Sequence, residues 1–211
     1  SYLAYLRHLC VPADSTGNKN IKKLEPGQFI RIDKNGKISK KIYWDPFTFS
    51  VNHDLNEKNV VEELDRLLNE SVEYRKVSDV EVGLFLSGGL DSSLLGKLMK
   101  KNSDSSLKAF NVDFEENFEG YKGELKEARF ASSEIGINLN EEKINFDNFK
   151  EIFDNYAYYQ DDLVGDEVGI PLYFLGKSSR SSGIKVVLVG EGSDELFYGS
   201  DHWNRLLKLS K

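Results

Sequence analysis

The second half of the sequence alternates short apolar runs with longer amphipathic segments, and this alternation restricts the fold more than any other feature. Four of the apolar runs are expected to be strands, over residues 80–86, 107–114, 139–144 and 184–189. Apolar spacing of three and four residues predicts helices over 92–99, 124–135, 146–159 and 170–180. This order of elements predicts a doubly wound α/β fold: a parallel sheet with right-handed crossovers and helices on both faces.

The first 50 residues have a different character and predict a β-hairpin. Two strand-like runs, 28–32 and 37–44, flank the segment Asp33-Lys34-Asn35-Gly36, and Asn-Gly is a strong signal for a hairpin turn. One hairpin buries too little apolar surface to be stable by itself. We therefore expect the hairpin to pack against another part of this chain or against a further domain. Apolar spacing from Val60 to Val72 then predicts a helix before the first strand of the sheet.

Composition and charge exclude several classes of protein. Lys and Arg number 28 against 35 Asp and Glu, a net charge of −7, whereas nucleic-acid binding requires a basic face. The single cysteine, Cys10, cannot form an intrachain disulfide, and we expect it to be a small packing residue. No apolar run reaches the roughly 20 residues that cross a bilayer, and the sequence opens without a signal-peptide layout. A cytoplasmic protein with neither nucleic-acid nor membrane partners is expected.

The loop after the first strand of the predicted sheet has a composition suited to anions, and it reads Ser87-Gly88-Gly89-Leu90-Asp91-Ser92-Ser93. Its glycines let backbone N–H groups converge on one point, and the helix that follows adds donors and partial positive charge. Asp91 fits an anion site if Mg²⁺ accompanies the anion, because Mg²⁺ favours one or two carboxylates plus phosphate oxygens. The loop is neither a P-loop nor a dinucleotide-binding fingerprint. An ordinary turn before a capped helix is the alternative.

A second glycine-containing loop, rich in acidic residues, follows the last strand and reads Gly190-Glu191-Gly192-Ser193-Asp194-Glu195-Leu196-Phe197. Doubly wound sheets bind ligands at the carboxyl ends of their strands, near the switch in strand order. We therefore expect this loop to face the first one across the binding crevice. Carboxylates beside a polyphosphate repel it unless a divalent metal intervenes, so Asp91 and Asp194 are predicted to coordinate Mg²⁺. A solvated acidic turn is the alternative.

Together the two loops resemble the signature loops of the glutamine-dependent asparagine synthetase family, whose synthetase domain is an ATP pyrophosphatase of the PP-loop type. The similarity extends to segments 110–114 and 161–173 and, in the first part of the chain, to 21–29 and 43–46. It implies that residues 1–50 are the C-terminal end of a glutaminase (class II amidotransferase) domain with its linker. Residues 51–211 would be a synthetase domain of the adenine nucleotide alpha-hydrolase-like fold, truncated at its C-terminus. Cys10 does not match the family's N-terminal nucleophile, so no glutaminase activity is expected of this chain alone.

The resemblance also implies a reaction. The carboxylate of aspartate, or of a related acid, attacks ATP to form an acyl-adenylate with release of pyrophosphate, and glutamine-derived ammonia then displaces AMP. Glu191 and Asp91 are the implied catalytic residues, with Glu191 acting on the incoming amine, while Leu86 and Val112 flank the adenosine. The implied contacts with ATP and pyrophosphate are Leu86, Ser87, Gly88, Gly89, Leu90, Asp91, Ser92, Ser93, Val112, Val189, Gly190 and Asp194. Val189 stands where asparagine synthetases often have serine, which bears on one nucleotide contact and on the substrate.

Several other functions stay open at this point. Relatives within the family amidate sugars, close lactams or cyclise peptides, and a nucleotide-binding fragment without turnover is a further alternative. Members of the wider group that modify tRNA usually carry reactive cysteine pairs and basic surfaces, so one cysteine and a net charge of −7 argue against them. The implied partners are therefore small molecules, namely ATP, a carboxylate such as aspartate, and ammonia. A homodimer is compatible with the resemblance.

Overall fold

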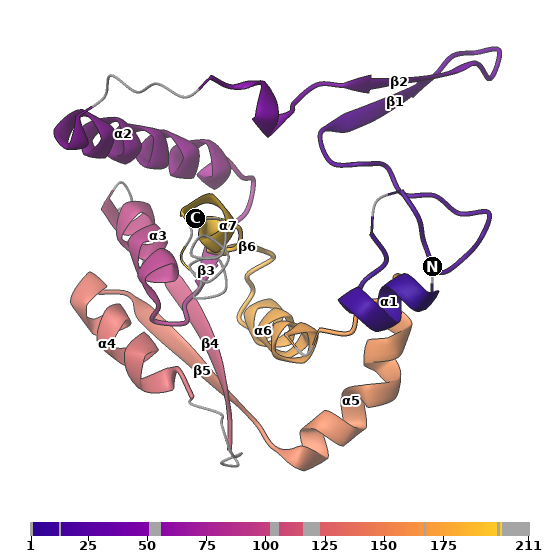
Figure 1. Cartoon of the computed structure of the whole chain (residues 1–211). Helices are drawn as coiled ribbons and strands as arrows, with labels where there is room; N and C mark the ends of the chain where they lie inside the picture. Colours follow the sequence, from indigo (N-terminus) through magenta and orange to yellow (C-terminus); the bar gives the residue numbers. More distant parts are fainter. Residues whose placement is uncertain are drawn as a thin grey trace, which may run out of the picture. The chain divides into compact units, whose positions relative to one another are not determined.

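The computed structural model describes residues 2–12, 14–50, 56–101, 106–115, 123–166, 168–197 and 199 (Figure 1). The chain divides into two compact units. Unit 1 comprises Ser1–Glu57 together with Ile152–Gly169, and unit 2 comprises Lys58–Glu151 together with Ile170–Lys211. Unit 1 is thus built from two stretches that lie far apart in the sequence.

Unit 2 is built on a parallel sheet, as the alternation of apolar runs predicted. Its four strands are β3 (Val82–Phe85), β4 (Lys108–Phe114), β5 (Asn138–Ile144) and β6 (Val186–Leu188). Their order across the sheet is β5-β4-β3-β6, with every neighbouring pair parallel. The chain adds β4 and β5 on one side of β3 and β6 on the other. The strand order therefore switches between β3 and β6, and sheets of this kind bind ligands at the carboxyl ends of two such strands.

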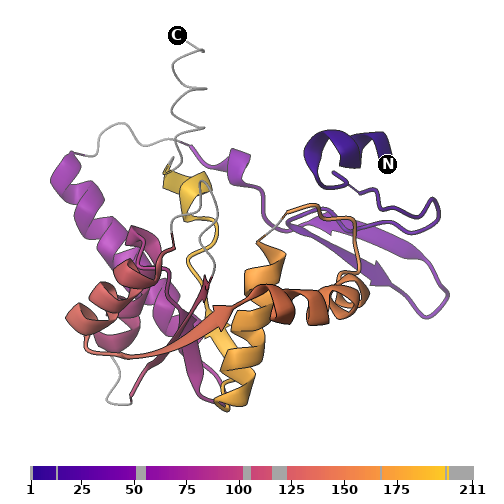
Figure 2. The same ribbon diagram turned by 90° about the horizontal axis from the view of Figure 1, so that it is seen from below.

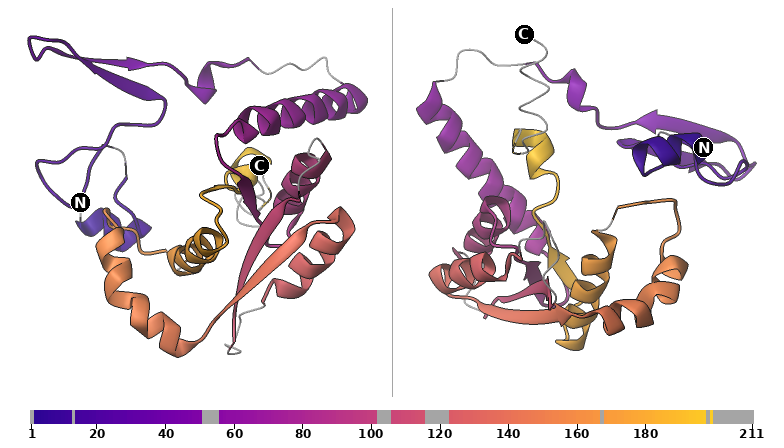
Figure 3. Two further views of the ribbon diagram at one scale, coloured as in Figure 1. Left: turned by 180° about the vertical axis from the view of Figure 1, so that it is seen from behind. Right: turned by 60° about the horizontal axis from the view of Figure 1, so that its bottom comes forward.

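Helices cover both faces of this sheet (Figures 2 and 3). One face carries α2 (Glu57–Lys76), α3 (Leu90–Lys101) and α4 (Leu125–Ile135), and the other carries α6 (Gly169–Ser181). The first face holds the main apolar core, formed by Val72, Leu84, Leu86, Leu98, Met99, Leu107, Ala109 and Ala131. Alternate strand residues point to opposite faces, so Ala109 belongs to this core while Phe110 lies on the other face beside Gly83. The doubly wound fold is confirmed.

The predicted elements agree with the observed ones to within a few residues, and glycines account for two of the boundaries. Gly136 ends α4 in the left-handed conformation, with φ of 73°, and its N–H donates to Ser132 and Ser133. After α6, Gly183 has φ of 82° and the N–H of Ile184 donates to Ser179, a helix cap. Because Ile184 is engaged in this cap, the last strand begins at Val186 rather than at the predicted residue 184. Among the described residues, no helix has the length and apolarity required to span a membrane.

Unit 1 contains the predicted hairpin, formed by β1 (Gln28–Ile32) and β2 (Ile38–Ile42), which pair antiparallel. The Asp33 carboxylate accepts hydrogen bonds from the N–H groups of Asn35 (2.8 Å) and Lys37 (2.9 Å), and Gly36 adopts a φ of 79°. These features are those of an Asn-Gly turn closed by an Asx bond. The remaining regular elements that the structure describes in this unit are the helix α1 (Tyr2–His8), the 3₁₀ turn Pro46–Thr48 and the end of α5 (Phe146–Tyr159).

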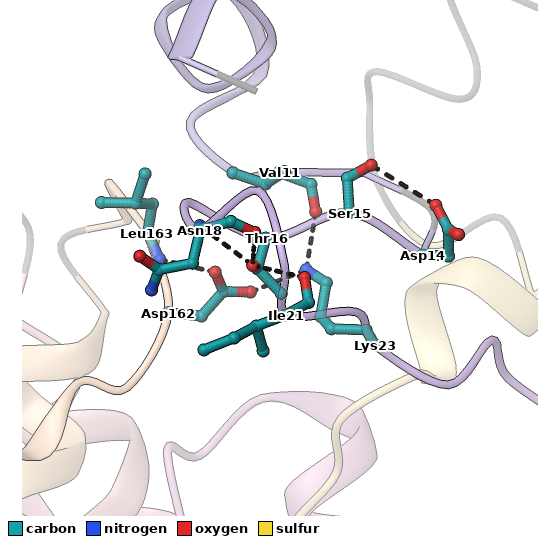
Figure 4. Close-up of polar contacts among 9 residues, drawn as sticks. All are labelled: Val11, Asp14, Ser15, Thr16, Asn18, Ile21, Lys23, Asp162 and Leu163. Atoms are coloured by element: carbon teal, nitrogen blue, oxygen red, sulfur yellow. Dashed lines mark hydrogen bonds and ion pairs between the residues drawn. The ribbon is translucent and has the colours of Figure 1, made fainter.

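A lysine ties the two stretches of unit 1 together (Figure 4). Lys23 Nζ donates to the Val11 carbonyl and to Asp162 Oδ2, both at 2.7 Å. The hydrogen bond from Lys23 lowers the pKa of the Asp162 carboxyl, as does the Leu163 N–H. Beside this pair, Cys10 forms an antiparallel bridge with Val164. The side chain of Cys10 is exposed, so the interpretation of Cys10 as a packing residue was wrong.

Candidate functional site

The predicted anion loop leaves the sheet at the carboxyl end of β3 and enters α3 at Leu90. Its serines hold its shape. The Ser87 N–H donates to Ser92 Oγ (3.3 Å), the two hydroxyl oxygens lie 3.0 Å apart, and the Gly89 N–H donates to Ser87 Oγ (3.2 Å). These bonds fold the loop back on the first turn of α3, and a glycine-containing loop that leads into a helix is an arrangement that anion sites use.

One serine hydroxyl in the first turn of α3 has no hydrogen-bond partner among the described residues. This atom is Ser93 Oγ, which is buried, whereas the backbone N–H of Ser93 is satisfied by the Gly89 carbonyl at 3.1 Å. Buried polar atoms are nearly always paired, and exceptions call for an explanation such as a ligand. The predicted role of Ser93 in binding phosphate stays a prediction.

Gly88 sets how closely the loop approaches α4. Its φ is 87°, and a Cβ at this position would overlap the backbone of Glu127 and Ala128 in the first turn of α4. Only glycine satisfies both the left-handed conformation and the contact. The loop therefore rests directly on a second helix, a feature that the sequence did not reveal.

The second predicted loop meets the first. It follows β6, whose register with β3 pairs Leu84 with Leu188. A Cβ on Gly190 would lie 3.3 Å from both Asp91 Cβ and the Ser92 backbone nitrogen. Gly190 thus touches the first turn of α3, and the absence of a side chain permits the approach. The expected juxtaposition of the two loops is present at this point.

The other predicted residues lie around this contact. Leu86, which directly follows β3, donates its N–H to the Phe110 carbonyl at 2.9 Å, and this bond brings Leu86 beside the part of β4 that contains Val112. Val189 follows β6 directly and is 40% exposed.

The two acidic residues predicted in the second loop, Glu191 and Asp194, have exposed side chains. Asp194 lies in the short helix α7 (Ser193–Phe197), where its carboxylate approaches Gly199. The contact with Asp91 that the structure describes is thus made by Gly190.

Sequence reasoning missed Asn111, which lies beneath the anion loop. Its side-chain Nδ2 donates to the Leu86 carbonyl at 2.8 Å, and the residue is only 5% exposed. The available signal was an amide side chain with an apolar neighbour on each side, Phe110 and Val112, because a buried polar residue in a strand needs a partner.

Comparison with known proteins identifies the family to which this geometry belongs. Residues 63–211 match the family described as asparagine synthase. The chain belongs to the asparagine synthase family. Over 205 residues it is 34% identical to a glutamine-hydrolysing asparagine synthetase of Bacillus subtilis, covering 97% of this chain and 31% of that protein. It is 28% identical over 198 residues to a Penicillium rubens protein named as an amidase, covering 87% and 29% of the two chains.

Among solved structures, the glutamine-dependent NAD⁺ synthetase of Acinetobacter baumannii with ADP is similar at 17% identity and a TM-score of 0.43. The match covers 77% of this chain and 32% of that one. The chain spans about a third of the length of the curated relatives that it matches. The parallel sheet with helices on both faces has the doubly wound α/β architecture that the sequence predicted.

In this asparagine synthase family member, the start of α4 beside the anion loop is crowded with carboxylates. Partial burial raises the pKa of Glu124, and the neighbouring charges of Glu127 and Asp113 raise it further. A raised pKa in the folded state means that this group contributes stability below its ordinary pKa of 4.5, and that the contribution is lost as the pH rises through the higher folded-state value.

Replacing Glu124 with glutamine should therefore stabilise the protein at pH 7 and have a smaller effect at pH 4, because only the charged form is disfavoured. Thermal unfolding followed by circular dichroism at both pH values checks the result. Glu134→Gln, which removes an exposed carboxylate from the same helix, is the matched control for the loss of one negative charge. A melting temperature of Glu124→Gln that falls below the wild-type value at pH 7 would contradict the assigned cause of the shift.

Proposed function

We propose that the chain is the nucleotide-binding core of an ATP-dependent amide-forming ligase of the asparagine synthetase type. In this proposal, a carboxylate of aspartate or a related acid is converted to an acyl-adenylate with release of pyrophosphate, and ammonia derived from glutamine then displaces AMP. A carboxylate is a poor acyl donor because its leaving group would be oxide, and adenylation supplies a better one. Residues 1–50 would be the end of the glutaminase domain and residues 51–211 the synthetase domain.

One observation carries the proposal: the Ser87–Ser93 loop enters α3 with its backbone folded by its own serines, and Gly190 of the second loop lies against it. Family membership over residues 63–211 adds support. In the proposal, the N–H groups and hydroxyls of residues 87–93 hold the pyrophosphate, and Leu86 and Val112 flank the adenosine. Fixed donors aimed at the departing phosphates stabilise the charge that develops on them.

The residues present fit a magnesium ion that arrives with the nucleotide. Among the described residues, no group of three or more His, Cys, Asp or Glu side chains could hold a metal ion by itself. Mg²⁺ in nucleotide sites needs only one or two carboxylates, since phosphate oxygens and water complete its shell. We propose that Asp91 and Asp194 supply those carboxylates. When bound, the ion would neutralise phosphate charge. Glu191, with its exposed side chain, would orient or deprotonate the incoming amine.

The test is titration calorimetry of the 211-residue chain with Mg·ATP, followed by a pyrophosphate-release assay with and without aspartate. We expect saturable binding, with a Kd within the range of about 1 μM to 1 mM that is typical of enzyme substrates. Binding should become weaker, but stay measurable, when EDTA removes the magnesium. A chain that unfolds cooperatively, and is therefore folded, yet binds no Mg·ATP would overturn the proposal.

The same two loops would also serve a second candidate function, which is nucleotide binding without turnover. The same assays separate the two functions. Pyrophosphate release that depends on aspartate supports the ligase, whereas Mg·ATP binding without release supports the binding module. Release that depends on another carboxylate would keep the ligase chemistry and change the substrate.

A further inference from the structure

The carbonyl of Leu86 is the last backbone group of the sheet before the anion loop begins. Its partner is the Nδ2 of Asn111, at 2.8 Å. The N–H of the same residue donates to the Phe110 carbonyl at 2.9 Å. Both backbone groups of Leu86 are thus held by two consecutive residues of β4. The point at which the chain turns into Ser87-Gly88-Gly89 is therefore fixed on both sides of Leu86.

The other end of the Asn111 amide is unusual. Its Oδ1 is buried and has no hydrogen-bond partner among the described residues. The reverse orientation of the amide would place two acceptors, Oδ1 and the Leu86 carbonyl, against each other, so the donor must face Leu86. An unpaired buried amide oxygen is costly. This cost falls on a residue that is only 5% exposed and whose donor holds the carbonyl next to the anion loop.

We infer that Asn111 is a positioning residue that holds the anion loop in its ligand-binding geometry. The inference rests on the proposed function, since the ligand in question is the pyrophosphate portion of ATP. Asn111 acts through Leu86 and does not touch the ligand. By clamping the Leu86 carbonyl, it keeps the N–H groups that follow converged before the ligand arrives. Preorganised donors bind more tightly because less ordering is needed on binding.

The chain contains a matched control for this hydrogen bond. Asn140 on β5 also donates its Nδ2 to a strand carbonyl, that of Ala109 on β4, at 3.1 Å. The chemistry and the sheet are the same, but Ala109 lies in the interior of a strand. Loss of the Asn140 amide should therefore cost stability without changing the loop.

The informative change is Asn111→Leu, which keeps the size of the side chain and removes both polar atoms. We expect its overall stability to stay close to that of the wild type, because the loss of an unpaired oxygen offsets the loss of the Leu86 partner. Amide hydrogen exchange in a peptide covering residues 86–94 should become at least about fivefold faster, since local opening sets exchange rates. Mg·ATP should bind about tenfold more weakly, a difference of about 1.4 kcal/mol.

Asn111→Asp gives a second readout that a purely structural role would not produce. A charged carboxylate cannot donate to the Leu86 carbonyl, whereas a protonated one can. At each pH, the exchange rate of residues 86–94 is corrected for the intrinsic rate and compared with that of the wild type. The variant should exchange faster than the wild type at neutral pH, and this difference should disappear as the pH is lowered. Asn140→Leu should leave both exchange in this peptide and the Mg·ATP Kd at their wild-type values.

Failure of the inference and failure of the proposed function give different results. Unchanged exchange in residues 86–94 for Asn111→Leu overturns the positioning role, and so does an unchanged Kd for Mg·ATP. Equal effects of Asn140→Leu also overturn it. If the wild-type chain binds no Mg·ATP, the proposed function fails, and the exchange measurement alone then decides whether Asn111 holds the loop.

Discussion

Gly88→Ala should lower the free energy of unfolding by about 3 kcal/mol and abolish detectable Mg·ATP binding. Two effects combine at this position. The left-handed conformation, with φ of 87°, costs an alanine roughly 1–2 kcal/mol. The added methyl group also overlaps the backbone of Glu127 and Ala128, and overpacking typically costs about 1–3 kcal/mol. The overlap can be relieved only by moving the loop or α4, which disperses the N–H groups that are proposed to hold phosphate. Urea unfolding and calorimetry measure the two losses.

A control variant separates the two causes. Gly136, which caps α4, has a similar φ of 73°, but a methyl group added there would point into open space, with no heavy atom from elsewhere in the described chain within 4 Å. Gly136→Ala should therefore cost only about 1 kcal/mol, in line with the conformational penalty alone, and leave the Kd for Mg·ATP unchanged. If Gly88→Ala were no less stable than Gly136→Ala, the close packing of the anion loop on α4 would be wrong.

Asp91→Asn should weaken binding of Mg·ATP by about tenfold or more and should have the opposite effect on ATP without magnesium. If the carboxylate helps to hold the ion, its loss removes a favourable charge interaction from the complex. In the presence of EDTA the same carboxylate only repels the phosphates, so the asparagine variant should bind free ATP more tightly than the wild type does. Calorimetric titrations with magnesium and with EDTA provide the comparison, and the reversal of the effect is the signature of a metal ligand.

Asp79→Asn is the matched control for this experiment. Asp79 is an exposed aspartate that precedes β3, at the opposite end of the strand from the anion loop, and its replacement changes the net charge by the same amount. It should bind ATP like the wild type with magnesium and with EDTA alike. If Asp91→Asn weakened binding equally in both conditions, Asp91 would act on the nucleotide without a metal, and the proposed magnesium role would fail.

Sequence patterns predicted most of unit 2 because the apolar residues within each helix or strand indicate which of its faces are buried. A strand covered on both faces must be apolar along its length, so β3 and the start of β4 were recognisable. β5, which carries Glu141, Glu142 and Lys143, was expected near an edge, and it is one of the two edge strands of the described sheet. The start of β6 was harder to predict from the sequence, since the helix cap at Ile184 depends on the conformation of Gly183. An apolar residue in a cap has the same sequence signature as one in a strand.

The candidate site also has features that the local sequence predicted and features that it did not. The composition of residues 87–93 and 190–195 located both loops, because phosphate chemistry calls for glycine, serine and a carboxylate. The contact between Gly88 and α4 and the hydrogen bond from Asn111 to Leu86 depend on which elements become neighbours in space. No local pattern encodes that information. The assignment of individual ligand-binding roles stays a prediction.

The pairing of Lys23 with Asp162, and of Cys10 with Val164, has a practical consequence for dissecting this protein. The family match begins at residue 63, which suggests that a shortened chain starting there would be self-contained. Such a truncation would discard Lys23 and Cys10 while retaining the stretch 152–169 that folds with them. The retained stretch would then lose an ion pair and a backbone bridge in the connection that leads into α6. A recombinant version intended to isolate the sheet should therefore keep residues 9–23.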